Sequence, residues 1–170
     1  MTFTTTLKPR MKPDETVFLG KLETNFPSKE VNGKEVIRNG ESFYKISNAD
    51  LMRPFFMSIV SNSDHWMFIS SNGSLSAGRK NSNYALFPYY TDDKITEAVE
   101  TTGSKSIFLV TVNDKKYLWE PFSNRHQGIY KVSRNLYKNV LGNKVIFEEI
   151  NHDLNVGFTY EWNSSEKYGF

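Results

Sequence analysis

The sequence predicts an all-β fold, an antiparallel β-sandwich built from hairpins and meanders with one or two short helices at most. Asn-Gly pairs stand at Asn32–Gly33, Asn39–Gly40 and Asn72–Gly73. Type I′ hairpin turns need a positive φ at both central positions, and Asn-Gly supplies it at little cost. Short apolar or alternating segments recur between turn signals, which is typical of a sandwich.

The first half of the chain is expected to be strands joined by these turns. Gly20 interrupts the first strand and suggests a bulge there. Asn48 can cap one helical turn over Asn48–Met52. The strands expected here are Thr16–Leu22, Lys34–Ile37, Ser42–Ile46, Phe55–Val60, His65–Ser70 and Ser74–Ala77.

A short helix is expected between the two halves, over Asp92–Glu100. Asp92 can cap it, and Ile95 and Val99 share one face at a spacing of four residues. The run Ser106–Val112 is continuously apolar and bounded by turn residues, so we expect a central strand buried on both faces.

The last third alternates between apolar and polar residues. A turn at Asn113–Asp114 leads into a strand at Lys115–Glu120, and a turn at Gly142–Asn143 joins two longer strands. In the final strand, Val156, Phe158, Tyr160 and Trp162 fall on one face, which predicts a half-buried strand. The strands expected after Glu120 are Tyr137–Leu141, Lys144–Ile150 and Asn155–Trp162.

Residues 1–14 are polar and contain Pro9 and Pro13, so we expect a flexible lead-in there. Residues 15–170 then form a single β-sandwich domain. The chain ends in KYGF, with Tyr168 and Phe170 entering what looks like another strand. Natural ends are usually polar, so the sandwich is expected to be incomplete at this end and to continue in a longer protein.

Composition excludes several classes of function. The apolar fraction is 38% and the aromatic fraction 15%, so the core is expected to be rich in aromatic rings. The net charge of +2 comes from scattered cations, which argues against a nucleic-acid partner. The absence of cysteine excludes disulfides and cysteine-ligated metals. No apolar run of about 20 residues indicates a membrane span, and no signal peptide precedes the strands, so a cytoplasmic location is expected.

The residues that could do chemistry form no recognisable catalytic pattern. His65, His126 and His152 lack partners at metal-ligand spacing, and no nucleophile elbow or phosphate loop is present. Glu148 and Glu149 are adjacent on a predicted strand, so they point to opposite faces and cannot flank one scissile bond. We therefore predict no catalytic residue, no metal and no cofactor within this chain.

The aromatic residues indicate a carbohydrate as the ligand. Exposed Trp and Tyr rings stack on apolar sugar faces, and nearby polar groups bind the hydroxyls. Core packing of the rings and simple solvation of the loop charges are the competing interpretations. The candidate contacts are Trp66, Arg79, Tyr89, Tyr90, Trp119, Arg125 and His126.

The central region resembles the opening of carbohydrate phosphorylases of the cellobiose/chitobiose phosphorylase type. The similar segments are PFFMSIVSN at 54–62, HWMFI at 65–69, the Arg79 loop, LFPYY at 86–90, WEPFS at 119–123 and Arg125–Tyr130. The resemblance covers roughly residues 40–170. It implies a galactose-mutarotase-like super-sandwich that supports the catalytic barrel, helps to form a homodimer and brings Arg79 and the Arg125–His126 loop near the sugar.

This chain departs from that family in two respects. The glycine-rich turn of those enzymes is replaced here by Ser63-Asp64-His65. Their catalytic acid lies in a later helical barrel, and this chain has no such helices. The resemblance therefore implies a non-catalytic segment whose partners are a carbohydrate and a downstream catalytic domain. The alternatives are an autonomous carbohydrate-binding module and a structural or interaction β domain without a small ligand.

Overall fold

The computed structural model describes residues 17–18, 29–59, 61, 64–85, 105–123 and 128–164. These residues form an all-β fold in which the helical elements are two single turns, η1 (Ala49–Leu51) and η2 (Ser82–Tyr84). The expected helix at Asp92–Glu100 lies outside the described residues. Within the described part, no helix is long and apolar enough to span a membrane. The strands are β1 (Val17–Phe18), β2 (Asn32–Arg38), β3 (Glu41–Ser47), β4 (Phe56–Ser58), β5 (His65–Ser70), β6 (Leu75–Arg79), β7 (Phe108–Val112), β8 (Lys115–Trp119), β9 (Val132–Asn139), β10 (Lys144–Asn151) and β11 (Val156–Asn163).

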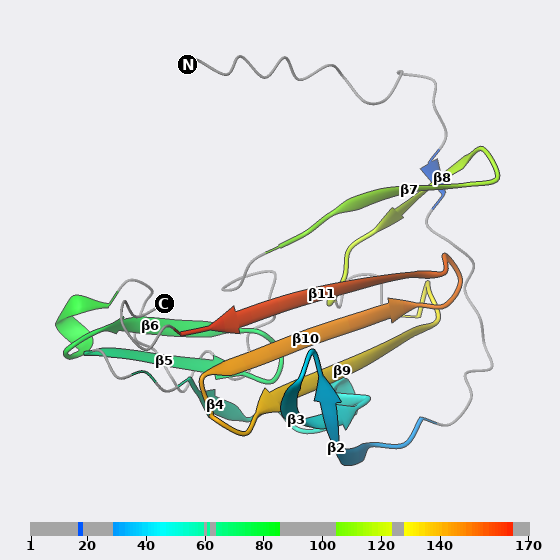
Figure 1. The fold of residues 1–170 in the computed structure, drawn as a ribbon. Coiled ribbons are helices and arrows are strands. Elements are labelled where there is room, and N and C mark those ends of the chain that lie inside the picture. Colours follow the sequence, from blue (N-terminus) through cyan, green and yellow to red (C-terminus); the bar gives the residue numbers. More distant parts are fainter. Residues whose placement is uncertain are drawn as a thin grey trace, which may run out of the picture.

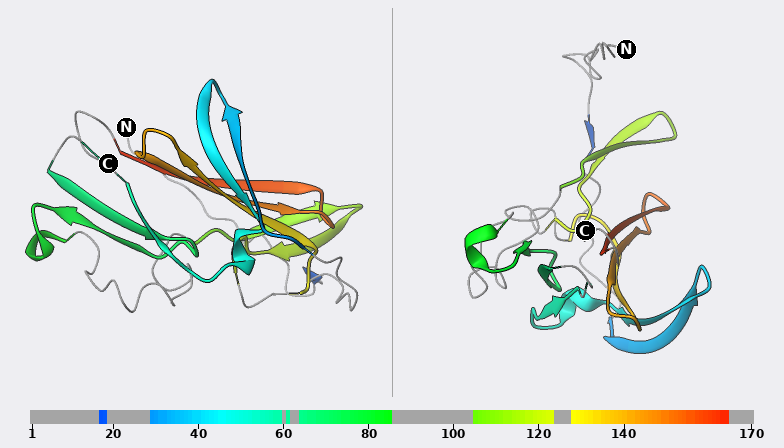
Figure 2. Two further views of the ribbon diagram at one scale, coloured as in Figure 1. Left: turned by 90° about the horizontal axis from the view of Figure 1, so that it is seen from below. Right: turned by 60° about the vertical axis from the view of Figure 1, so that its left-hand side comes forward.

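The largest sheet has five strands in the order β11-β10-β9-β3-β2, and all of its neighbours are antiparallel. β9, β10 and β11 form a meander, and the N-terminal hairpin β2–β3 joins it through the pairing of β3 with β9 (Figure 1). The hairpin crosses the meander steeply (Figure 2). Twist of this size is common when a two-stranded ribbon extends from a sheet.

A second sheet, β4-β5-β6, packs on one face of the five-stranded sheet and completes the sandwich. Met67, Ile69 and Leu75 come from this sheet, and Leu136 and Phe147 come from the larger one. All five side chains are at most 5% exposed. The larger sheet thus has an inner face toward β4–β6 and an opposite outer face. The outer face carries Asn32, Lys34, Val36, Arg38, Glu41, Phe43, Lys45, Ser47, Ser133, Asn135, Tyr137, Asn139, Lys144, Ile146, Glu148, Thr159 and Glu161.

A third, small sheet has the order β1-β8-β7, with β1 parallel to β8. Trp119 at the end of β8 packs with Tyr130 and Leu154 in a separate core cluster. Phe108 on β7 contacts the rings of Trp119 and Phe158 at centroid distances of 5.5 and 5.2 Å. These contacts attach the small sheet to the meander.

The expectation for Ser106–Val112 was wrong in its burial. β7 is an edge strand, and Phe108 remains 36% exposed. An unbroken apolar run indicates hydrophobicity but does not give the position of a strand in its sheet. In the described part of the chain none of the five residues of β7 is fully buried. The final strand was predicted correctly, because Val156, Phe158, Tyr160 and Trp162 are all more buried than their neighbours.

The turn predictions had mixed outcomes. Asn39 and Gly40 have φ values of 53° and 79°, which confirms the hairpin turn of β2–β3. Asn32 and Gly33 form no turn, since both lie inside β2 and pair with Ser47 and Ile46. The larger sheet provides strand partners for the whole segment, and tertiary pairing overrides the local preference.

The helical turn η1 forms where Asn48 was expected to cap it, but the cap was wrong. Asn48 has a φ of 54° and makes no side-chain cap. Its amide instead donates to the Glu30 carbonyl oxygen at 2.8 Å. The residue therefore holds the segment before β2 against the turn after β3.

Candidate functional site

Of the two tryptophans among the predicted sugar contacts, Trp119 is placed in the protein interior. It is 4% exposed, and its indole Nε1 donates to Glu149 Oε1 at 2.9 Å. Glu149 is itself 1% exposed and accepts further hydrogen bonds from Arg134 Nε at 2.8 Å and from the Phe122 backbone N–H at 2.6 Å. A ring held in this way has no face available for a sugar. We therefore assign Trp119 to the core, as the competing interpretation of the sequence expected.

Trp66 is the second residue of β5 and lies against Gly78 of β6. The two residues are register partners, and a Cβ on Gly78 would lie 2.5 Å from the tryptophan ring. The ring also packs against Phe68, with 6.0 Å between the centroids. The absence of a side chain at Gly78 allows the Trp66 ring and the backbone of Tyr84 and Ala85 to approach β6 closely.

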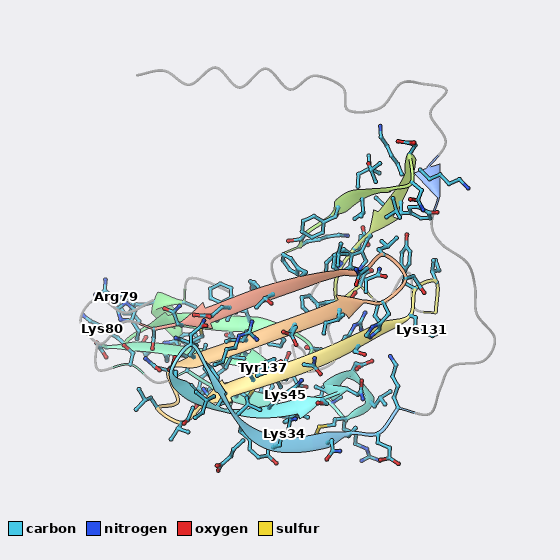
Figure 3. The ribbon with its side chains drawn as sticks, turned by 45° about the vertical axis from the view of Figure 1, so that its right-hand side comes forward. Lys34, Lys45, Arg79, Lys80, Lys131 and Tyr137 are labelled. Atoms are coloured by element: carbon cyan, nitrogen blue, oxygen red, sulfur yellow. The ribbon has the colours of Figure 1, made fainter. Side chains whose placement is uncertain are left out.

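Arg79 is exposed at the end of β6 and begins an exposed polar loop, Arg79–Tyr84, which we call the 79–84 loop. Tyr84 is 59% exposed, and the Lys80 ammonium lies 5.7 Å from the centroid of its ring. Figure 3 shows Arg79 and Lys80 together at one end of the molecule. Lys80 thus lies against an exposed phenol ring, and Arg79 precedes it in the chain.

The backbone of the 79–84 loop is firmly held. Lys80 has a φ of 56°, a left-handed conformation that costs energy for a residue with a Cβ. Its N–H donates to the Asp64 carbonyl oxygen at 3.0 Å, and the Asn81 side chain accepts from the Asn83 N–H at 3.1 Å. Backbone strain of this kind is concentrated at functional sites. The loop therefore presents its side chains in a fixed arrangement.

The remaining predicted contacts, Tyr89, Tyr90, Arg125 and His126, lie outside the described residues. Trp66 and Arg79 both lie on the β5–β6 hairpin, but Trp66 pairs with Gly78 and Arg79 with His65, so their side chains are on opposite faces of the sheet. Trp119 lies apart from both, in a separate core cluster.

The outer face of the five-stranded sheet holds a charged cluster that sequence reasoning missed. Glu148 accepts hydrogen bonds from the Tyr137 hydroxyl at 2.7 Å and the Asn135 amide at 2.8 Å. Arg38 Nη1 lies 3.3 Å from its other oxygen. The Arg38 guanidinium and the Lys45 ammonium lie 5.1 and 5.4 Å from the centroid of the Tyr137 ring.

The electrostatics of this cluster favour binding over acid–base catalysis. Burial alone raises the pKa of Glu148, but the hydrogen bonds from Tyr137 and Asn135 and the charges of Arg38 and Lys45 outweigh it and lower the pKa. Burial, together with the hydrogen bond to Glu148, raises the pKa of the Tyr137 phenol. At neutral pH the carboxylate is thus ionised and the phenol protonated. Neither group is tuned to exchange protons near neutrality.

A serine–histidine contact is also present on this sheet. Ser133 Oγ lies 2.8 Å from His152 Nε2, and both residues are accessible to solvent. In the described part of the chain no carboxylate orients His152, so the pair lacks the third member of a nucleophilic triad. The described residues also contain no group of three or more His, Cys, Asp or Glu side chains that could hold a metal ion.

Comparisons with protein-family models and with curated proteins find no match for this chain.

Proposed function

We propose that this chain is a carbohydrate-binding β-sandwich that supports the catalytic part of a glycoside phosphorylase- or hydrolase-like enzyme and is not catalytic on its own. The observation that carries the proposal is the 79–84 loop, where Tyr84 is 59% exposed, the Lys80 ammonium lies 5.7 Å from its ring centroid, and Arg79 begins the same exposed loop. An exposed ring can stack on the apolar face of a sugar, and the cations can donate hydrogen bonds to its hydroxyls. The resemblance of the sequence to carbohydrate phosphorylases implies the same role for Arg79.

The rigidity of the loop supports the same proposal. Affinity for a flexible sugar depends on how much order must be created on binding. The contacts of Lys80 with Asp64 and of Asn81 with Asn83 fix the loop before a ligand arrives. Because the backbone is already ordered, ligand binding to the ring and the cations costs little conformational entropy in the loop.

The experiment is thermal unfolding of residues 1–170 with neutral oligosaccharides of glucose and of N-acetylglucosamine. A ligand that binds only the folded state stabilises it, by about 2.7 kcal/mol at a hundred times its Kd. We expect one of these series to raise the midpoint and Tyr84→Ala to remove the increase. The matched control is Tyr44→Ala, because Tyr44 is 50% exposed but lies on β3.

Two outcomes would contradict the proposal. The first is an upward shift that persists in both Tyr84→Ala and Arg79→Ala, since the loop would then not be the contact. The second is a cooperative transition that no sugar in either series moves. The proposal that the chain is non-catalytic is tested separately, by incubating it with the sugar that binds and looking for cleavage products.

Scaffolding is supported by a different surface. Ile37, Val140 and Leu141 are 78%, 76% and 69% exposed, although all are large and apolar. Ile37 is the register partner of Ser42, whose carbonyl oxygen accepts a hydrogen bond from the Val140 N–H. Exposed apolar groups gathered in this way fit a protein partner. Sedimentation of the chain alone tests whether that partner is a second copy, and Val140→Lys should then shift the chain toward monomer.

A further inference from the structure

The outer face of the five-stranded sheet carries more positive charge than its carboxylates neutralise. Glu41 pairs with Lys144 at 2.7 Å, and Glu161 lies 3.8 Å from the same ammonium. Glu148 pairs with Arg38. Lys34 and Lys45 have no ion-pair partner among the residues that the structure describes.

These two lysines stand directly opposite each other. Lys34 on β2 is the register partner of Lys45 on β3, and Lys45 is in turn the register partner of Tyr137 on β9. Figure 3 shows Lys34, Lys45 and Tyr137 in succession across the three strands. Like charges directly opposite on neighbouring strands destabilise a sheet. An anion between the two ammonium groups would remove that cost.

A third cation is brought to the same place by the curvature of the hairpin. Arg38 lies on β2, which β3 and β9 separate from β10, and yet its guanidinium reaches Glu148 on β10. The hairpin must therefore bend over the outer face. The result is that Arg38 and Lys45 both lie against the ring of Tyr137, at 5.1 and 5.4 Å from its centroid.

Groups that suit sugar hydroxyls flank the cations. One row along the strands, Asn32 is the register partner of Ser47, and Ser47 is the register partner of Asn135. Asn32 is exposed and Ser47 half-buried, so an amide and a hydroxyl are available beside the lysine pair. A carboxylate alone would need only the cations, whereas a uronic acid residue would use both rows.

We propose that the outer face binds an acidic saccharide, with the carboxylate between Lys34 and Lys45 and the hydroxyls on the row of Asn32 and Ser47. Glu148 pairs with Arg38 over Tyr137. Lys45 lies over the same ring, and in the part of the chain that the structure describes neither Lys34 nor Lys45 has an ion pair that competes with the ligand. This site is separate from the 79–84 loop and does not depend on the function proposed for it.

The probe is trigalacturonate, and its fully methyl-esterified form is the neutral counterpart with the same backbone. Binding to residues 1–170 is measured by calorimetry at constant ionic strength, because exposed charges are screened by salt. We expect the acid to bind and the ester to bind at least tenfold more weakly. Each of Lys34→Gln and Lys45→Gln should weaken binding of the acid by about fivefold.

Stability without ligand separates a binding role from a structural one. Lys34→Gln removes one member of the like-charge pair, so the thermal midpoint in ligand-free buffer should stay the same or increase. Lys115→Gln removes an exposed lysine of the small sheet, outside both proposed sites, and should leave trigalacturonate binding unchanged.

Three outcomes would overturn the inference. Loss of binding in Lys80→Gln but not in Lys34→Gln would place the acid on the 79–84 loop. Equal affinity for the acid and its ester would show that the carboxylate is not recognised. If a short polyglutamate peptide bound as tightly as trigalacturonate, the outer face would bind any acidic polymer and would not recognise sugar hydroxyls. These three outcomes can be interpreted in the same way if neutral sugars do not bind to the 79–84 loop.

Discussion

The indole of Trp119 donates a hydrogen bond to the carboxylate of Glu149, with 2.9 Å between Nε1 and Oε1. The first residue ends β8 of the small sheet, and the second lies on the inner face of β10. Phe122, in the segment that follows β8, has a φ of 63° and donates its N–H to the same carboxylate. One buried side chain thus holds both the end of a strand and a strained backbone in place.

Glu149→Gln should destabilise the protein strongly. Arg134, whose side chain is 17% exposed, would lose its ionised partner, and one of the three donors to Glu149 would face an amide N–H. Removing one partner of a buried ion pair lowers the free energy of unfolding by about 3–5 kcal/mol. Urea unfolding measures the loss. Glu161→Gln is the control, because that side chain is 38% exposed and 3.8 Å from Lys144, and a change of equal size there would contradict the assignment.

Gly78→Ala should destabilise the β5–β6 hairpin. The added Cβ would lie 2.5 Å from the Trp66 ring and 2.8 Å from the Ala85 Cα and the Tyr84 carbonyl oxygen. Overpacking of this kind costs about 1–3 kcal/mol. Thermal unfolding checks the expectation. At Gly157 the nearest atom to an added Cβ is 3.9 Å away, so Gly157→Ala serves as the comparison and should change the midpoint far less.

Asp114→Gly should stabilise the β7–β8 hairpin. Asn113 and Asp114 have φ values of 49° and 59°, so both central residues of the turn are left-handed. Glycine adopts this conformation without steric cost, and the gain should be up to about 1 kcal/mol. Gly40→Ala tests the reverse, since Gly40 has a φ of 79° in the β2–β3 turn. Urea midpoints that moved in the same direction for both variants would contradict the argument.

Lowering the pH should destabilise the folded protein, because Glu148 on the outer face becomes protonated. Although burial alone would raise its pKa, the hydrogen bonds from Tyr137 and Asn135 and the charges of Arg38 and Lys45 lower it overall. A carboxyl whose pKa is lower in the folded state stabilises that state above its unfolded pKa. That contribution is lost as the pH falls through the folded pKa.

The measurement is the free energy of unfolding between pH 6 and pH 2. Glu148→Gln should flatten the acid limb of this curve relative to the wild type. Glu35→Gln removes an exposed carboxylate from the same sheet and should leave the limb in place. An unchanged acid limb in Glu148→Gln would show that the cluster does not contribute.

Local patterns predicted much of this fold. The alternation from Val156 to Trp162 located β11 and its buried face, and Asn39–Gly40 located the tip of a hairpin. Predictions failed where the decisive contacts are distant in sequence. The segment containing Asn32 and Gly33 joins a strand because β3 pairs with it along its whole length. The run at Ser106–Val112 contains β7, which is an edge strand among the residues that the structure describes.

The candidate sites were predictable to different degrees. Arg79 could be found because a glycine-containing polar loop is visible in the sequence. The outer-face cluster could not, because Arg38 and Glu148 are 110 residues apart and meet only when the hairpin bends over the sheet. Trp119 was misassigned because an indole bonded to a buried carboxylate and an indole that stacks on a sugar look alike in sequence.

The pairing of β3 with β9 also governs the order in which the molecule can assemble. β9, β10 and β11 are joined by short turns, so their pairing closes small loops and can begin early. Phe43 and Asn139 pair only after the whole chain between them has been enclosed, which costs more entropy. The hairpin should therefore dock late. During synthesis the hairpin leaves the ribosome before β9–β11, so it must wait for these strands before it has a sheet to join.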